Sequence, residues 1–177
     1  MQTGSLVKQK DRGNVLLELS FDAPDQPPKI KTLYNSAPHR FHSAVLERVG
    51  EFRMPCMKPG GPTVLAQQHF SFQGVAQTTD MALRDMSLVT FLGVAKDVDK
   101  VPVKFDLGTM ACPFQVRFGL YQPAAGNTVV ASGKYVPERG PFLSWLSTLA
   151  LNISTTQFEA LMGAQMVIDV PCGTIQL

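Results

Sequence analysis

The chain has 177 residues, of which 45% are hydrophobic and 17% are charged, and its formal net charge is +2. This composition excludes a disordered chain, and the length fits one globular domain with a sizeable core. No apolar run reaches the ~18 residues of a membrane-spanning helix, and the first residues lack the apolar stretch of a signal peptide, which predicts a protein made and kept in the cytosol.

The charge is unevenly distributed along the sequence. Residues 1–60 hold nine Lys and Arg against six acids, a net charge of +3, whereas residues 61–177 hold seven against eight, a net charge of −1. A basic side can face the phosphate of lipid headgroups or of nucleic acid. An ordinary solvated surface has the same composition, so both interpretations stay open.

Residues 1–13 are polar and basic, and we expect a flexible arm there, followed by one globular domain over residues 14–177. In NVLLELSF (14–21), alternate apolar residues predict a half-buried strand. Three prolines then end the strand: Pro24, Pro27 and Pro28. A surface loop is one interpretation; because Pro24 and Pro27 fit PxxP, an extended segment that a partner binds is the other.

The segment SAPHRFHSAVLERVGEF (36–52) predicts a helix. Ser36 is a candidate N-cap, and Pro38 suits a first helical turn. Apolar residues recur at helical spacing on one stripe: Phe41, Val45, Val49 and Phe52. A loop rich in proline and glycine follows, in which the Met and Lys side chains either touch a membrane or partner, or pack onto the domain.

From residue 64 onward the patterns are mainly β. Strands are predicted over 64–72, 101–107, 113–121 and 128–136, the last two as a hairpin. Two apolar segments, 86–95 and 140–153, fit a buried strand or a helix, because periodicity cannot separate the two.

The segment STTQFEALMGAQMVIDVPCGTIQL (154–177) predicts a short helix and two strands. Ser154 and Gln157 have the spacing of a capping box, and Gly163 can end the helix in a left-handed conformation. The strands over 165–170 and 174–177 are expected to pair as a closing β-hairpin. The predicted class is α+β: a single domain with an antiparallel sheet, an early helix, a late helix and that hairpin.

Motifs for catalysis and nucleotide binding are absent from the sequence, which has no P-loop, GxGxxG, GxSxG or HExxH. His39 and His42 have a spacing that can hold a metal, but no third ligand is near in sequence, which favours a solvated helix face. The three cysteines, Cys56, Cys112 and Cys172, are odd in number and widely spaced, which argues against a disulfide framework or a zinc knuckle. For Cys112 a buried thiol is the default interpretation. We therefore expect no catalytic residue, no metal and no cofactor.

The order of these elements resembles that of rhabdovirus matrix proteins, especially the short, cytorhabdovirus-like members of plant viruses. The segments that carry the resemblance are VLLELSF followed by HRFHSAVLERVGEF, then CPFQVRFGLY, then STTQFEALMGAQMVIDVPCGTIQL. It covers about residues 14–177. The chain departs from family members of animal viruses, which carry a Pro-Pro-x-Tyr budding motif, because Lys29 and Ile30 follow Pro27 and Pro28 here.

The resemblance implies a structural protein of the virion that self-associates, condenses the ribonucleoprotein core and links it to the inner face of the envelope, with the host cytoplasm as its other location. Its implied partners are further copies of the chain in an open homo-oligomer, the viral nucleoprotein or ribonucleoprotein, anionic membrane lipids and RNA. Candidate residues for anionic surfaces are Lys8, Lys10, Arg12, Lys29, Lys31 and Lys58. Candidates for self-association are Pro24, Pro27 and Pro28.

Three other classes of function remain open from the sequence. An icosahedral coat subunit with a jelly-roll fold is one, since the strand number from residue 64 nearly suffices, although the two helix patterns argue against it. A module that binds nucleic acid on a sheet face is another. A cysteine- or histidine-dependent enzyme is the third, and it would need a base that only the fold can supply.

Overall fold

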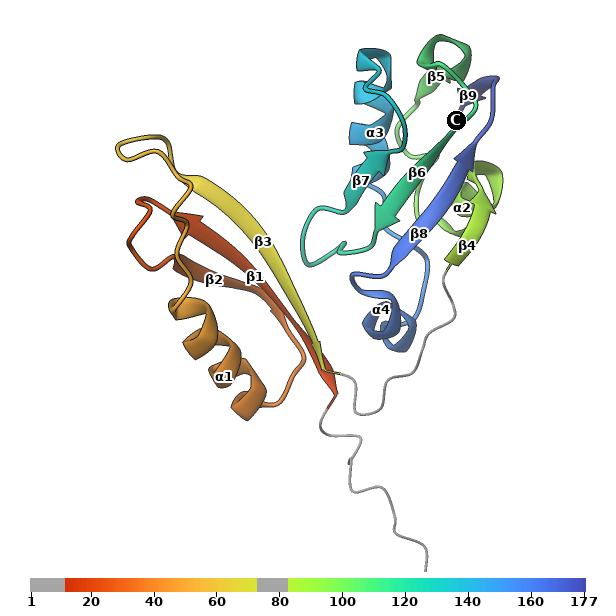
Figure 1. Cartoon of the computed structure of the whole chain (residues 1–177). Helices are drawn as coiled ribbons and strands as arrows, with labels where there is room; N and C mark the ends of the chain where they lie inside the picture. Colours follow the sequence, from red (N-terminus) through yellow and green to blue (C-terminus); the bar gives the residue numbers. More distant parts are fainter. Residues whose placement is uncertain (1–11, 73–82) are drawn as a thin grey trace, which may run out of the picture. The chain divides into compact units, whose positions relative to one another are not determined.

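The computed structural model describes residues 12–72 and 83–177, and the contacts within the chain divide it into two compact units, Met1–Gln77 and Thr78–Leu177 (Figure 1). The α+β class is confirmed, because helices and mainly antiparallel sheets occur together. The sequence patterns had placed residues 14–177 in one domain, whereas each unit has a hydrophobic core of its own. Periodicity predicts which face of an element is buried but not which elements share a core.

Unit 1 is a three-stranded antiparallel sheet with one helix against it. The strands are β1 (Gly13–Phe21), β2 (Lys29–Asn35) and β3 (Val64–Phe72), in the order β2-β1-β3, and the helix is α1 (His39–Gly50). Figure 1 shows α1 lying along one side of this sheet.

The core of unit 1 forms between β1 and α1 as the sequence predicts. Val15 and Leu17 of β1 are fully buried, and so is Val49 of α1, in one cluster with Val45. Each apolar side chain of this size contributes about 1.5–3 kcal/mol when it is buried. The predicted strand and the predicted helical stripe are therefore both confirmed, but β1 is not half-buried along its whole length, because Leu16 on its other face is fully buried as well.

The start of α1 differs from the sequence prediction. Pro38 occupies the N-cap position and no side chain caps the helix, so the assignment of Ser36 as N-cap was wrong. The Ser36 Oγ instead accepts a hydrogen bond from the Asn14 backbone N–H (2.8 Å), and the Ser36 N–H donates to the Asn14 carbonyl (2.9 Å). Ser36 thus extends the pairing of β2 with β1 before the helix begins.

Unit 2 contains two sheets with helices between its strands. In chain order its elements are β4 (Leu83–Ser87), α2 (Leu88–Val94), β5 (Lys104–Asp106), the 3-10 helix η2 (Leu107–Met110), β6 (Phe114–Gly119), β7 (Thr128–Ala131), the 3-10 helix η3 (Pro137–Arg139), α3 (Gly140–Ser147), α4 (Thr155–Leu161), β8 (Gln165–Val170) and β9 (Thr174–Gln176). The larger sheet has the order β4-β8-β6-β7, with only β4 and β8 parallel, and β5 pairs with β9.

Aromatic rings fill the core of unit 2. Phe118 of β6 meets Phe91 of α2 edge to face, with 4.8 Å between the ring centroids, and Phe142 of α3 is fully buried in the same cluster. The segment 86–95, which fitted strand or helix, is the end of β4 and then α2. The helix starts where the Ser87 side chain accepts a hydrogen bond from the Thr90 N–H (3.1 Å). Residues 140–147 of the other ambiguous segment form α3.

The capping box at the start of α4 is confirmed. The Gln157 N–H donates to the Ser154 Oγ (3.2 Å), and the Ser154 N–H donates to the Gln157 side chain (2.9 Å). Met162 is buried after the helix, and Gly163 has a φ of +75°, the left-handed conformation expected of it.

The predicted closing hairpin of β8 and β9 is wrong. Strand β9 pairs with β5 instead, with Phe105 opposite Ile175. The reason is that β4 and β6 already occupy both edges of β8, so β8 has no free edge to offer. The strand predicted over 101–107 is shorter in the structure, where β5 covers only Lys104–Asp106 and Val101 is 68% exposed.

No helix within residues 12–72 and 83–177 combines the length and the hydropathy that crossing a bilayer requires.

Candidate interaction surfaces

The basic residues predicted to bind anionic surfaces do not form one patch. Lys8 and Lys10 lie outside the described residues, and Arg12 is exposed immediately before β1. Lys29 and Lys31 lie on β2, and Lys29 pairs with Ser20 near the end of β1. Strand β1 has nine residues, a length of about 30 Å, so Arg12 and Lys29 lie near opposite ends of the sheet.

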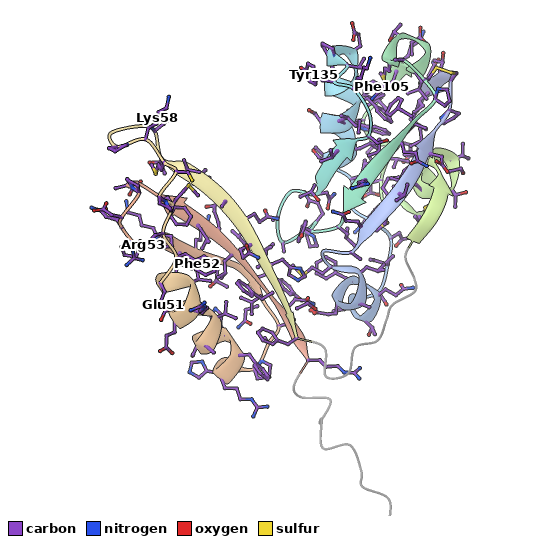
Figure 2. All side chains as sticks on the ribbon, in the orientation of Figure 1. Glu51, Phe52, Arg53, Lys58, Phe105 and Tyr135 are labelled. Carbon is purple, nitrogen blue, oxygen red and sulfur yellow. A yellow bond between two sulfur atoms is a disulfide. The ribbon has the colours of Figure 1, made fainter. Side chains whose placement is uncertain are left out.

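Two connections pack together at the end of unit 1 that is remote from Arg12, and we call residues 22–28 and 53–63 the loop end. The Met54 N–H donates to the Pro24 carbonyl (3.2 Å). Met57 is buried in the core cluster of unit 1, so of the two interpretations of this loop the structure supports the one in which methionine packs onto the protein. Lys58 is exposed here (Figure 2).

Asp22 ties the loop end together and neutralises one of the candidate lysines. Its carboxylate accepts a hydrogen bond from the Thr63 hydroxyl (2.7 Å) and forms an ion pair with the Lys29 ammonium (2.7 Å). The hydrogen bonds from Lys29 and Thr63 lower the pKa of Asp22. The Lys29 charge is therefore partly compensated, which weakens the case for Lys29 as a phosphate contact.

The proline-rich segment is a tight connection between β1 and β2, not an extended ligand. The Gln26 N–H donates to the Ala23 carbonyl (3.4 Å), which closes a turn over residues 23–26 that overlaps the PxxP sequence. Pro28 is buried, so its assignment to a self-association surface was wrong, whereas Pro27 is exposed and Pro24 is half-buried. Of the two interpretations of this segment, the surface loop is confirmed.

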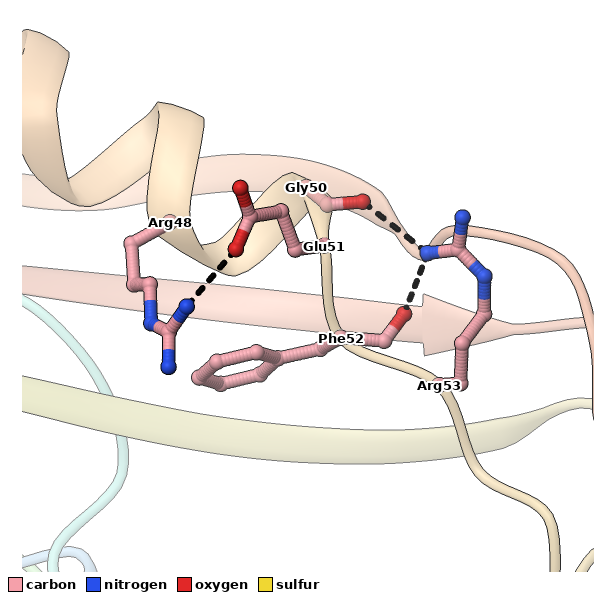
Figure 3. Close-up of polar contacts among 5 residues, drawn as sticks. All are labelled: Arg48, Gly50, Glu51, Phe52 and Arg53. Atoms are coloured by element: carbon pink, nitrogen blue, oxygen red, sulfur yellow. Dashed lines mark hydrogen bonds and ion pairs between the residues drawn. The ribbon is translucent and has the colours of Figure 1, made fainter.

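Two arginines near the end of α1 make contacts within their own segment (Figure 3). The Arg48 guanidinium pairs with the Glu51 carboxylate (2.7 Å), and one Arg53 Nη1 donates to the carbonyls of Gly50 (3.1 Å) and Phe52 (2.8 Å). Arg53 thereby satisfies carbonyl groups at the helix end. Exposed pairs of this kind contribute at most about 1 kcal/mol to stability. Arg48 and Arg53 can therefore give up these contacts for contacts with a binding partner.

The sheet face opposite α1 has little net charge. Cross-strand register places two rows there: Tyr34, Leu16 and His69, and next to them Lys31, Glu18 and Gln67. Lys31 lies directly opposite Glu18, and opposite charges in such a pair attract each other. Because the charge of Lys31 is compensated in this way, the sheet face is a poor candidate for a site that binds phosphate groups.

His69 is half-buried on that face beside a buried polar side chain. Its Nε2 lies 2.8 Å from the Asn14 Oδ1, and Asn14 is only 3% exposed. Burial lowers the pKa of His69 from its ordinary value of 6.5, because the charged imidazolium loses solvation.

This shift predicts that unit 1 loses stability in mild acid. Above a pH of about 6.5 the His69 imidazole is neutral in both the folded and the unfolded state. As the pH falls below this value, the unfolded chain binds a proton before the folded chain does. The free energy of unfolding therefore falls until the pH reaches the lower pKa of the folded state. Hydrogen exchange of the β1 amides at about pH 7.5 and about pH 5 measures the loss, after correction for intrinsic exchange rates.

The pH dependence should be smaller in His69→Gln, which cannot titrate and retains a polar group near Asn14. The exposed His39→Gln is the matched control and should behave as the parent does. Equal pH dependence of the parent and of His69→Gln would show that His69 is not the titrating group.

The two histidines at the start of α1 contact different hydroxyl groups. The His42 Nε2 lies 3.1 Å from the Thr32 hydroxyl on β2, and the His39 Nε2 lies 3.5 Å from that of Ser43. Among the described residues, no three His, Cys, Asp or Glu side chains are grouped as a metal site would require.

The cysteines overturn two sequence expectations. Cys112 and Cys172 form a disulfide, with 5.1 Å between their Cα atoms and a sequence separation of 60. The expectation of a buried Cys112 thiol was therefore wrong, and the argument against a disulfide framework missed this single bridge. Cys56 is a free and exposed thiol in the loop end. The count of three was compatible with one bridge, but spacing alone did not indicate which pair the fold brings together.

A shallow hollow of about 420 Å³ lies beside this disulfide in unit 2. Its lining residues are Ser87, Pro113, Phe114, Gln115, Asp169, Val170 and Pro171. Pro113 and Pro171 each adjoin a cysteine of the bridge, so the disulfide fixes both prolines. Asp169 is the charged residue in this lining, and one of its oxygens accepts a hydrogen bond from the Gln115 side chain (2.9 Å).

Arg139 is a buried cation that sequence reasoning missed. It is 6% exposed, and its Nε, Nη1 and Nη2 donate to the carbonyls of Met110 (2.8 Å), Ser132 (3.2 Å) and Ala111 (3.2 Å). Its guanidinium lies over the Phe114 ring, 4.0 Å from the centroid, as cation–π attraction favours. Nothing in the local sequence PERGPF distinguishes this arginine from an exposed one.

Comparisons with known proteins gave no match: no family model, no curated protein and no solved structure is detectably similar to this chain.

Proposed function

We propose that this protein is a structural component of an enveloped virus particle: a matrix protein that self-associates and links the ribonucleoprotein core to the inner face of the envelope. The observation that carries the proposal is the order of elements. Two strands and a helix open the fold, mainly antiparallel strands follow with two more helices among them, and a capped helix precedes the last two strands. The resemblance to rhabdovirus matrix proteins depends on this order, except that it implied one strand before the first helix and a hairpin at the end.

The surfaces of the two units suit a protein that works by contact. Arg12 and Lys58 are exposed in unit 1, and Tyr135 is 90% exposed in unit 2. A basic residue near an anionic membrane contributes only about 1 kcal/mol, but many subunits bound together multiply such small contributions. Self-association and membrane binding would therefore support each other.

The disulfide refines where the protein acts. Glutathione keeps thiols reduced in the cytosol, whereas disulfides persist in oxidising surroundings that include released virus particles. We therefore assign the bridged form of Cys112 and Cys172 to the particle and the reduced form to the host cytoplasm.

The alternative of a jelly-roll coat subunit loses its structural basis. The described strands form sheets of three, four and two strands, not the two facing four-stranded sheets of a jelly roll. The alternative of a module that binds nucleic acid on a sheet face is disfavoured in unit 1 by the pairing of Lys31 with Glu18.

Flotation with phosphatidylserine liposomes tests the membrane contact. The variant Lys8→Gln/Lys10→Gln/Arg12→Gln should lose most of the flotation of the parent at low salt, and parental flotation should weaken towards physiological salt, where the screening length is about 8 Å. Its thermal midpoint should stay unchanged, because Lys and Arg side chains are almost never part of a hydrophobic core.

A matched control removes three positive charges from unit 2: Lys96→Gln/Lys100→Gln/Lys104→Gln, all of them exposed. It should float as the parent does. If the variant at residues 8, 10 and 12 also floats as the parent does, these residues are not the contact, and Lys58 becomes the next candidate. A parent that neither floats nor self-associates contradicts the proposed function.

A further inference from the structure

One exposed aromatic side chain in unit 2 projects from a short connection between β7 and η3. Tyr135 is 90% exposed, more than any other large apolar side chain among the described residues. Lys134 beside it is exposed as well, and Gly133 has a φ of +87°, which suits a glycine in a tight turn. We call residues 133–135 the tip; Figure 2 labels Tyr135.

Arg139 contacts the residues that flank the tip, one through its buried side chain and the other through the first backbone hydrogen bond of η3. Its Nη1 donates to the Ser132 carbonyl (3.2 Å), and its backbone N–H donates to the carbonyl of Val136 (3.1 Å). The tip is therefore presented from a fixed base. A side chain held in this way loses less conformational entropy when it binds, and Tyr is among the residues that contribute most to interfaces.

The hollow beside the disulfide is complementary to the tip. Pro113 and Pro171 offer apolar surfaces of the kind that pack well against aromatic rings, and the volume of about 420 Å³ accommodates one phenol side chain. Asp169 has acceptor capacity beyond its hydrogen bond from Gln115, because a carboxylate has two oxygens with about four acceptor sites. Lys134 provides the matching cation.

We propose that a second copy of this chain occupies the hollow: Tyr135 of one copy enters the hollow of the other, and Lys134 pairs with Asp169 across the interface. This inference rests on the self-association that the proposed function requires, and it names the surfaces responsible.

The tip and the hollow lie close enough together for a reciprocal exchange. The Arg139 guanidinium at the base of the tip binds the Ala111 carbonyl (3.2 Å), and Ala111 is two residues from Pro113 on the rim of the hollow. Two copies that meet at this part of unit 2 exchange tips about a two-fold axis, which makes the same surface serve on both sides. The product is a closed two-fold dimer of unit 2, which differs from the open homo-oligomer that the resemblance implies.

Sedimentation velocity of the full chain over a range of concentrations tests the contact. Tyr135→Ala should raise the dissociation constant of self-association at least tenfold, because it removes the aromatic anchor. Val101→Ala, a truncation of another exposed side chain of unit 2, is the matched control and should change it less than twofold. Thermal midpoints of both variants should match the parent, since neither side chain is buried.

Swapping the charges of Lys134 and Asp169 distinguishes the loss of this specific contact from a general effect of changed surface charge. Lys134→Asp and Asp169→Lys should each weaken association, and the double variant should recover most of it, since the attraction is restored with its direction reversed. Mixing Tyr135→Ala with Asp169→Lys should also restore association in part, because such a pair retains one intact tip and one intact hollow.

Three outcomes overturn the inference. A parent that stays monomeric at every concentration does so, and it removes the self-association of the proposed function as well. A parent that associates while Tyr135→Ala associates equally overturns the inference alone. So does a double charge variant with no recovery when its thermal midpoint shows an intact fold.

Discussion

Reduction of the Cys112–Cys172 disulfide is expected to lower the free energy of unfolding of unit 2 by about 4 kcal/mol, because the bridge closes a loop of some 60 residues and so restricts the unfolded chain. The measurement is denaturant unfolding with and without reductant, followed by tryptophan fluorescence. Trp145 is the one tryptophan of the chain and lies on α3, so its signal reports unit 2.

Two variants make this result specific. Cys112→Ala/Cys172→Ala without reductant should reproduce the midpoint of the reduced parent. Cys56→Ser should change the stability by less than about 0.5 kcal/mol, because that thiol is free and exposed. The same midpoint with and without reductant would mean that the bridge contributes nothing to the stability of unit 2.

Replacement of Arg139 by Ala should destabilise unit 2 by about 3 kcal/mol. It leaves the carbonyls of Met110, Ser132 and Ala111 without the donors that satisfy them and removes the contact with the Phe114 ring. Trp145 fluorescence in denaturant measures the change.

The comparison with other arginine changes separates geometry from charge. Arg139→Lys keeps the charge but should recover only part of the stability, because an ammonium cannot reach three carbonyls in the way a planar guanidinium does. Arg117→Ala, at an exposed position of β6, is the matched control and should stay within about 0.5 kcal/mol of the parent. Equal effects of Arg139→Ala and Arg117→Ala would refute the structural role of Arg139.

Local patterns predicted the elements whose causes are local. The alternation of Val15, Leu17 and Leu19 gave β1, because a strand exposes its faces with a period of two. Ser154 and Gln157 gave the start of α4, because a capping box satisfies backbone donors within four residues. In both cases the interacting groups are close in sequence, so the pattern contains the information.

Features that join distant segments could not be predicted in this way. The partner of β9 depends on β8 having both edges occupied by β4 and β6, which no single segment reveals. Arg139 is buried because carbonyls 28 and 29 residues earlier in the chain surround it. The bridge between Cys112 and Cys172 likewise depends on the fold to bring the start of β6 and the end of β8 together.

The candidate interaction surfaces could also not be predicted fully, because contacts between distant segments decide which charges are free to bind a partner. Charge composition identified Lys29, Lys31 and Lys58 as exposed cations, which they are, but could not reveal that Asp22 pairs with Lys29 or that Glu18 lies opposite Lys31. Sequence reasoning placed Tyr135 inside a strand over 128–136, whereas β7 ends at Ala131, and so did not identify it as an exposed side chain. Only its 90% exposure distinguishes it.

The disulfide also determines how unit 2 carries mechanical load. Tension applied along the chain passes directly from Cys112 to Cys172, so residues 113–171 bear none of it while the bridge is intact. Fully extended, that stretch would add about 200 Å to the length of the chain. Strands β6, β7 and β8 and helices α3 and α4 are therefore shielded from stretching, and an assembly that pulls on its subunits can elongate only segments outside this covalent loop.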